Sequence, residues 1–211
     1  MESTYHIALL QRALGERISA RALEAITRAN IEQDGWHGLL FHPEYHCDED
    51  IPRALAYIEV CRAEAARATD CAEAWAAFGR LTHAVQDFYA HSNYVQLWAT
   101  RFDGERPPPE SIDGLDPELL QHPRLFAARV YLPLELLYYL PALRPWLKRM
   151  LPADSHAAMN LDNPETGPLF PYALEAARQR TIFEFERTLA LIGETQGEAA
   201  MQRFLDLEET A

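Results

Sequence analysis

Residues 71–102 read CAEAWAAFGRLTHAVQDFYAHSNYVQLWATRF, and this stretch decides the fold. Its apolar residues recur at helical spacing, so we expect one long helix at the centre of the protein. Gly79 is expected to be tolerated inside that helix. No run elsewhere alternates polar and apolar residues for long enough to predict a strand. The sequence therefore predicts an all-α fold.

Further helices are expected on both sides of this stretch. Asp50 is a plausible N-cap, because a proline follows it in the first turn. A long loop rich in proline, glycine and acid separates the central helix from the later ones. A chain of 211 residues is one domain by default, over residues 1–211. The other expected helices span residues 4–30, 50–68, 124–150 with breaks near Pro133 and Pro141, 172–196 and 197–209.

Charge and cysteine content restrict the class of protein. The net charge of −13 and the lack of a Lys/Arg run argue against binding to duplex nucleic acid. The three cysteines, Cys47, Cys61 and Cys71, are odd in number and form no CxxC pair, which is typical of reduced thiols. No basic-then-apolar leader is visible at the start of the sequence. We therefore expect a cytoplasmic protein, and export without a leader stays open.

The most apolar stretch is VYLPLELLYYLPALRPWL, residues 130–147. Three prolines, Glu135 and Arg144 interrupt it too often for a bilayer-spanning helix. We expect a broken, buried helix here. A lipid-facing surface is the alternative.

Three polar residues of the central stretch indicate a metal site. On a helix, steps of four residues drift by only about 40°, so His83, Asp87 and His91 share one face. The rise from His83 to His91 is roughly 12 Å, too far for both rings to meet one ion. Two or more ions bridged by Asp87 fit this spacing. The competing interpretation is chance spacing on a surface helix, or core histidines with local partners.

Other histidines support a metal site unevenly. Four potential ligands lie close together in one loop-like region: Asp34, His37, His42 and His46. His6 is as compatible with an exposed, frayed N-terminus as with a ligand. His156 is compatible with a helix start. His122 precedes a proline, and we expect it to be an ordinary loop residue.

Three segments resemble a known family. They are GRLTHAVQDFYAHSN at 79–93, YHCDEDIPRALAYI at 45–58 and HAAMNLDNP at 156–164. They are similar to Het-C-type proteins, within the all-helical group of zinc-dependent phospholipases C and fungal single-strand-specific nucleases. The resemblance implies a single-domain multi-helix bundle of the zinc-dependent phospholipase C type, with two or three zinc ions.

The resemblance also implies a ligand set. His83 and Asp87 would bind the first zinc with His46 and Asp34, and Asp34 would also orient or deprotonate the attacking water as a catalytic residue. His6 would hold another ion and share Asp87 with it. The remaining ion would be held by His91, His156 and a carboxylate, for which Asp162 is the candidate.

Three features depart from the family pattern. Secreted members use a mature N-terminal tryptophan as a ligand, whereas here Met1 lies five residues before His6. Ser3, Thr4 or a free amine would have to replace it. Asn160 stands where the family has a carboxylate, which makes Asp162 the nearest acid. His42 lies close enough to His46 to compete for its role.

The function implied is a zinc-dependent phosphodiesterase of phospholipase C type. It would cleave a phospholipid head group with metal-activated water, with transient contact to a membrane surface. A nuclease-like phosphodiesterase is one alternative. A non-catalytic helical metal-binding interaction module is another. The sequence lacks GxSxG, HExxH, ExxH and HD motifs, which argues against other hydrolase and metal classes.

Overall fold

A computed structural model describes residues 1–132, 134–138, 140, 143–147 and 150–207. Among these residues no strand forms, and two isolated bridges, Ser92–Ala127 and Arg129–Ser155, are the β pairings. The all-α prediction is confirmed, whereas one domain over 1–211 stays a prediction. The described α-helices are α1 (Ser3–Leu14), α2 (Ala20–Ile31), α3 (Trp36–Phe41), α4 (Ile51–Arg67), α5 (Cys71–His91), α6 (Tyr94–Ala99), α7 (Pro117–Leu120), α8 (Leu134–Tyr138), α9 (Arg144–Leu147), α10 (His156–Met159), α11 (Phe170–Gln196) and α12 (Glu198–Leu205).

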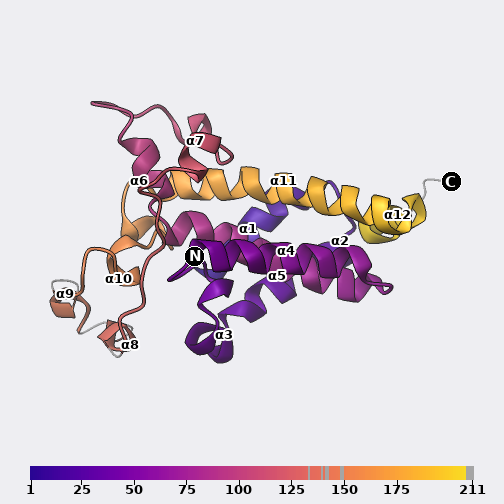
Figure 1. The fold of residues 1–211 in the computed structure, drawn as a ribbon, viewed down its shortest axis with the longest axis horizontal. Helices are drawn as coiled ribbons and strands as arrows, with labels where there is room; N and C mark the ends of the chain where they lie inside the picture. Colours follow the sequence, from indigo (N-terminus) through magenta and orange to yellow (C-terminus); the bar gives the residue numbers. More distant parts are fainter. Residues whose placement is uncertain (133, 139, 141–142, 148–149, 208–211) are drawn as a thin grey trace.

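Helix α5 is the axis of the molecule. Helices α2, α4 and α11 pack along it, as Figure 1 shows. Every residue from 81 to 91 is buried, so this half of α5 is enclosed on all sides. A helix that is buried all round must pair its polar side chains inside the protein. The polar face of α5 therefore needs partners from the surrounding elements.

Two hydrophobic clusters lie along α5. The first gathers around Phe78, Leu81 and Phe185, with side chains from α1, α2, α4, α11 and α12. The second gathers around Tyr89 and Tyr94, with side chains from α6 and α11. These clusters hold the C-terminal half of α5 rigidly between them, which fixes the positions of its polar residues.

The predicted helix over 71–102 is wrong in one respect, because it stops at His91 and resumes as α6. Backbone pairing with a distant loop causes the break. The amide of Ala128 donates to the His91 carbonyl at 2.7 Å, and the amide of Asn93 donates to the Phe126 carbonyl at 3.1 Å. These bonds replace helical ones, and Ser92 takes an extended conformation. This helix boundary is therefore set by contacts between residues that are far apart in the sequence.

Other predicted boundaries also change. The helix expected over 4–30 is two helices, because Ser19 takes an extended conformation and caps α2 through the amide of Ala22. The region 124–150 is less helical than predicted, with only α8 and α9 in its described part. The breaks expected at Pro133 and Pro141 lie outside the described residues. The long loop after α6 contains a short 3-10 turn, Pro109–Ser111, before α7 begins.

Gly79 has a packing role that the sequence did not indicate. A Cβ there would lie 2.4 Å from the Ile26 carbonyl oxygen, 2.8 Å from Ala29 Cβ and 3.1 Å from the Asn30 amide nitrogen. The prediction that the helix tolerates Gly79 is confirmed, since α5 continues through it, and the close packing adds a reason for a glycine there. Gly79 lets α2 approach α5 closely.

In Gly79→Ala the added methyl overpacks the α2–α5 contact, which typically costs about 1–3 kcal/mol. The nearest atom is a backbone oxygen at 2.4 Å, so we expect a cost toward the upper end of that range. The helix-propensity gain of about 1 kcal/mol offsets part of it, which leaves a net destabilisation of about 1–2 kcal/mol. Urea unfolding measures the difference. Gly104→Ala is the control, because nothing lies within 4 Å of the Cβ added there. Unchanged stability of Gly79→Ala would contradict the close-approach argument.

No helix among the described residues is both long enough and apolar enough to cross a membrane.

Candidate metal centre

Histidines and aspartates from six segments converge beside the C-terminal half of α5. They come from α1, the turn after α2, the loop before α4, α5 itself, α10 and the loop after α10. All eight sequence-predicted residues meet here, joined by one that was not predicted. The set is His6, Asp34, His46, Asp48, His83, Asp87, His91, His156 and Asp162.

The first candidate subsite joins Asp34, His46, His83 and Asp87. His83 Nε2 lies 3.0 Å from His46 Nδ1, and each of these nitrogens lies 3.1 Å from Asp87 Oδ2. Asp34 Oδ1 lies 3.7 Å from His83 Nε2 and 3.9 Å from His46 Nδ1. Four ligands on a tetrahedral ion with 2.0–2.2 Å bonds lie about 3.3–3.6 Å apart. The observed separations bracket that range.

The second candidate subsite joins His6 to the other oxygen of Asp87. His6 Nε2 lies 3.3 Å from Asp87 Oδ1, and the His6 ring stacks on His83. On the far side of the ring, His6 Nδ1 lies 2.6 Å from Gln86 Oε1. An amide oxygen can only accept, so Nδ1 carries the proton. The lone pair of His6 Nε2 therefore faces Asp87, the orientation that metal-binding histidines take.

Gln86 is itself held in place by buried partners. Asn30 Nδ2 donates to Gln86 Oε1 at 3.2 Å, and Gln86 Nε2 donates to Thr181 Oγ1 at 3.3 Å. These bonds fix which end of the amide faces His6. The arrangement resembles the outer hydrogen bonds that orient ligands in metal sites.

The third candidate subsite joins Asp48, His91, His156 and Asp162. His156 Nδ1 lies 3.2 Å from Asp48 Oδ1 and His156 Nε2 lies 3.6 Å from Asp162 Oδ2. His91 Nδ1 donates to the His46 carbonyl at 2.7 Å, which turns His91 Nε2 toward Asp162 Oδ1 at 2.9 Å. This subsite contains Asp162 in place of the carboxylate that the family pattern has at Asn160. Asn160 instead donates to the His156 carbonyl.

Asp48 is the residue that sequence reasoning missed. It lies two positions after His46, inside a run of acids in which no spacing rule singles it out. The backbone distinguishes it, because Cys47 and Glu49 on either side have φ of 52° and 68°. Left-handed conformations are costly for such residues and cluster at functional sites. Here they let His46 and Asp48 reach two different subsites from one short turn.

A buried positive charge already lies among the carboxylates. The Met1 amino group is 2.5 Å from Asp87 Oδ1, 2.9 Å from Asp162 Oδ1 and 3.3 Å from His91 Nε2. Burial opposes the charge, but Asp162 and Asp87 raise the pKa of this amine to about 11. Burial also opposes charge on Asp87, yet the amine and the histidines hold the Asp87 pKa well below its usual value. The pocket therefore favours a cation.

The histidines divide into two electrostatic groups. Burial, with neighbouring His6 and His46, lowers the pKa of His83 to about 4, so its ring is neutral at pH 7. A neutral imidazole is the form that binds metal. Burial opposes charge on His156, but Asp48 and Asp162 raise its pKa well above the usual value. A metal ion in the third subsite would have to displace that proton.

Three buried ring nitrogens have no hydrogen-bond partner among the described residues: His6 Nε2, His46 Nε2 and His83 Nδ1. The outer nitrogens of His46 and His83 lack a partner in either tautomer, so they do not distinguish the two cases. If these outer nitrogens carry the protons, the inner lone pairs face each other and Asp87. A cation between the inner nitrogens removes the repulsion in that case. The residues present therefore fit a bound metal.

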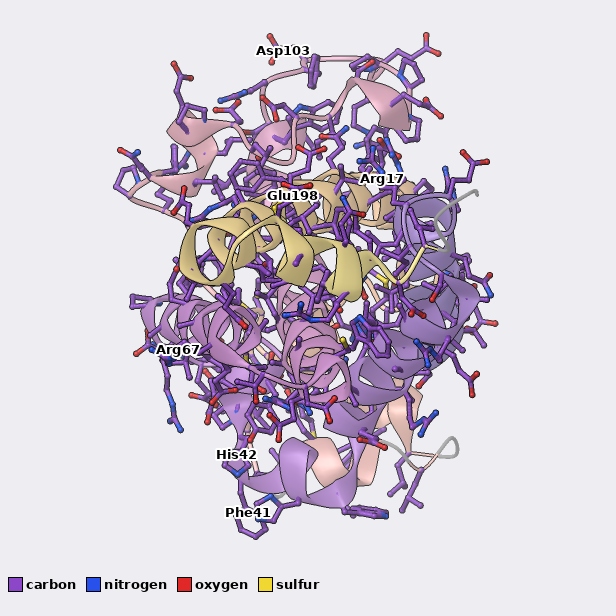
Figure 2. The ribbon with its side chains drawn as sticks, turned by 90° about the vertical axis from the view of Figure 1, so that its right-hand side faces the viewer. Arg17, Phe41, His42, Arg67, Asp103 and Glu198 are labelled. Atoms are coloured by element: carbon purple, nitrogen blue, oxygen red, sulfur yellow. The ribbon has the colours of Figure 1, made fainter. Side chains whose placement is uncertain are left out.

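The other polar residues singled out from the sequence lie outside the cluster. His42 Nδ1 pairs with Glu44 and the ring stacks on Tyr45, and Figure 2 shows His42 at the lower edge of the molecule. His42 therefore does not compete with His46. His37 is exposed. His122 accepts from the Arg124 amide within a turn. Ser3 reaches the cluster only indirectly, through a bond from its hydroxyl to Asp34 at 3.1 Å.

The chain is similar to one described family. The family model of the VWA7 N-terminal domain matches residues 3–107. The von Willebrand factor A domain-containing protein 7 of Rattus norvegicus is 37% identical over 91 residues, and that of Mus musculus is 35% identical over 91 residues. Each match covers 41% of this chain and only 10% of the relative. No solved structure matches the chain significantly.

These matches overturn the resemblance to Het-C-type proteins and the zinc-dependent phospholipase C and single-strand nuclease group. The predicted function, a phospholipase C-like phosphodiesterase, rested on that resemblance and is also wrong. The predicted enzyme class, a hydrolase, is wrong for the same reason. The physical reason is that i, i+4, i+8 spacing determines which side chains share a helix face, and not which reaction follows. The catalytic role of Asp34 concerns that reaction alone, so only its position as a candidate ligand has a structural basis.

Gln86→Met is expected to weaken the His6 subsite, because His6 loses the acceptor that fixes its tautomer. Loss of such an outer contact typically lowers metal affinity about 10–100-fold. Competition titration with a chromophoric chelator measures the affinity. The control is Gln179→Met, because Gln179 bonds to the Ile112 carbonyl and the Gly114 amide, away from the cluster. Equal affinities in the two variants would reject the orienting role of Gln86.

Proposed function

We propose that this domain binds divalent metal ions in one cluster of two or three subsites, of which the first two share Asp87. The observation that carries the proposal is the first subsite. Two imidazole nitrogens and one carboxylate oxygen lie 3.0–3.1 Å from one another, and a second carboxylate closes the set. Such convergence of nitrogen and oxygen atoms is the usual geometry of a four-ligand ion.

A network of hydrogen bonds and ion pairs without metal is the competing explanation. It accounts for the close contacts of His91 and His156 with carboxylates, which are favourable when the rings are charged. It accounts less well for the first subsite, where two imidazole nitrogens converge with two carboxylates and the neutral His83 ring brings no positive charge to balance them.

The identity of the ion follows from the donor set only in part. Imidazole with carboxylate suits zinc and other late first-row metals, whereas calcium and magnesium prefer all-oxygen sites. The prediction that the site holds two or three zinc ions is untested and stays a prediction. The predicted cytoplasmic location also stays a prediction.

The cluster would also stabilise the fold. Its candidate ligands come from α1, α5, α10 and the loops between them, so an ion bound among them would link segments that are far apart in the sequence. An ion that binds only the folded state adds stability in proportion to RT ln(1 + [L]/Kd), about 2.7 kcal/mol at a hundredfold excess over Kd. Metal binding and folding are then coupled.

Asp87→Asn is expected to remove more than one metal equivalent, because Asp87 contributes one oxygen to each of two subsites. Asp48→Asn is expected to remove at most one, because Asp48 faces only the third subsite. Elemental analysis after zinc loading and desalting measures both. Asp50→Asn is the matched control, since asparagine caps a helix as well as aspartate and Asp50 lies outside the cluster.

Wild-type protein that retains less than one ion per chain in excess zinc would contradict the proposal. So would equal losses in Asp87→Asn and Asp50→Asn.

Zinc is expected to raise the thermal unfolding midpoint of metal-stripped protein by several degrees, for a gain of about 2.7 kcal/mol. Differential scanning calorimetry measures the shift, and a chelator is expected to reverse it. Magnesium at the same concentration is the control and is expected to leave the midpoint unchanged. A midpoint that zinc does not move would count against binding to the folded state.

A further inference from the structure

Large apolar side chains concentrate on two segments that flank the candidate metal centre. Of the eleven that are exposed among the described residues, seven lie on α3 or within residues 131–151. Figure 1 shows α3 at the bottom of the molecule and α8 and α9 at its lower left, and Figure 2 shows Phe41 at the lower edge. We call these seven residues the apolar edge: Trp36, Phe41, Leu132, Leu137, Leu140, Trp146 and Met150.

The two tryptophans are the most informative members of the apolar edge. Trp36 is 78% exposed and Trp146 is 62% exposed, although such large side chains are usually well buried. Exposed apolar side chains that concentrate on a few segments, instead of being scattered singly, indicate an interaction site. Tryptophan also favours the boundary between water and lipid hydrocarbon, where its ring can remain half in each.

The segment that carries most of the apolar edge is anchored to the protein body. Leu147 and Leu151 are buried, and the buried Glu135 accepts from the Ala157 amide at 3.3 Å. The amide of His156 donates to the Arg129 carbonyl at 2.8 Å. The exposed side chains are therefore presented from a fixed base. The expectation of a buried helix over 130–147 is wrong for the members of the apolar edge.

The net charge of the segment that carries most of the apolar edge indicates which kind of partner binds there. Residues 129–151 contain four basic residues and one acid, a net charge of +3. The rest of the chain carries −16, since the whole chain carries −13. A basic segment with exposed Trp, Phe and Leu is the composition of elements that lie in the interface of anionic membranes. Helix α3 itself contains no Asp, Glu, Lys or Arg, so it is not repelled, whereas the acidic remainder of the chain would be, which favours one orientation of the protein.

We propose that the apolar edge docks on an anionic phospholipid surface. The exposed apolar side chains of the apolar edge enter the headgroup region, while the net positive charge of residues 129–151 attracts the segment to anionic lipid. Each basic residue near an anionic surface raises the partition coefficient about fivefold. Docking places α3 and α10, and with them the candidate metal centre, close to the membrane.

Vesicle co-sedimentation of the full chain tests this proposal. The variant is Trp36→Ser with Trp146→Ser, and the control is Val60→Ser with Leu207→Ser, which removes exposed apolar side chains from α4 and the region after α12. On vesicles of phosphatidylcholine with phosphatidylserine, the tryptophan variant is expected to bind at least about tenfold more weakly than wild type. The control variant is expected to stay within about twofold. Raising the salt concentration is expected to weaken wild-type binding.

Three results would overturn the proposal: equal binding by the two double variants, equal binding of wild type to pure phosphatidylcholine, or no vesicle binding at all. Sedimentation equilibrium tests whether a second copy of this chain, instead of a lipid surface, covers the apolar edge. If wild type self-associates and the tryptophan variant does not, the apolar edge joins two copies of this chain. Metal content is measured on the same samples, so a failure of the metal proposal is separately visible.

Discussion

The buried carboxylate of Asp87 is the constraint around which this protein is arranged. It has no access to solvent, and it contacts the Met1 amine, His6, His46 and His83. A charged group in such a place is stable only with opposite charge close by. The surrounding helices therefore have to deliver positive or metal-binding groups to one point, and the two hydrophobic clusters on α5 hold that point in place.

The outer hydrogen bonds extend this constraint through the fold. Gly79 allows α2 close to α5, α2 carries Asn30, and Asn30 helps to orient Gln86 toward His6. A position without a side chain thus contributes to the geometry of a ligand three contacts away. Packing and site geometry are linked, because Asn30 on α2 is one of the two side chains that hold Gln86.

The sequence predicted the parts of this arrangement that depend on local periodicity. Helical spacing predicted the all-α fold and the shared face of His83, Asp87 and His91. The break after His91 could not be predicted, because it depends on backbone bonds to residues 126–128. Asp48 could not be predicted either, because its position depends on left-handed backbone at its neighbours. The function assigned from motif resemblance was wrong, since ligand spacing does not encode chemistry.

The central claim concerns ions around Asp87, and one measurement tests it most directly. Anomalous diffraction at the zinc edge, from crystals of zinc-loaded protein, locates each ion independently of the protein model. We predict two peaks beside the Asp87 carboxylate, with a third among Asp48, His91 and His156 when all three subsites are filled, and neighbouring ions about 3.5–4 Å apart. The first of these lies between His46 Nδ1 and His83 Nε2. A map without anomalous peaks there, with His46 and His83 hydrogen-bonded to Asp87 alone, would contradict the account.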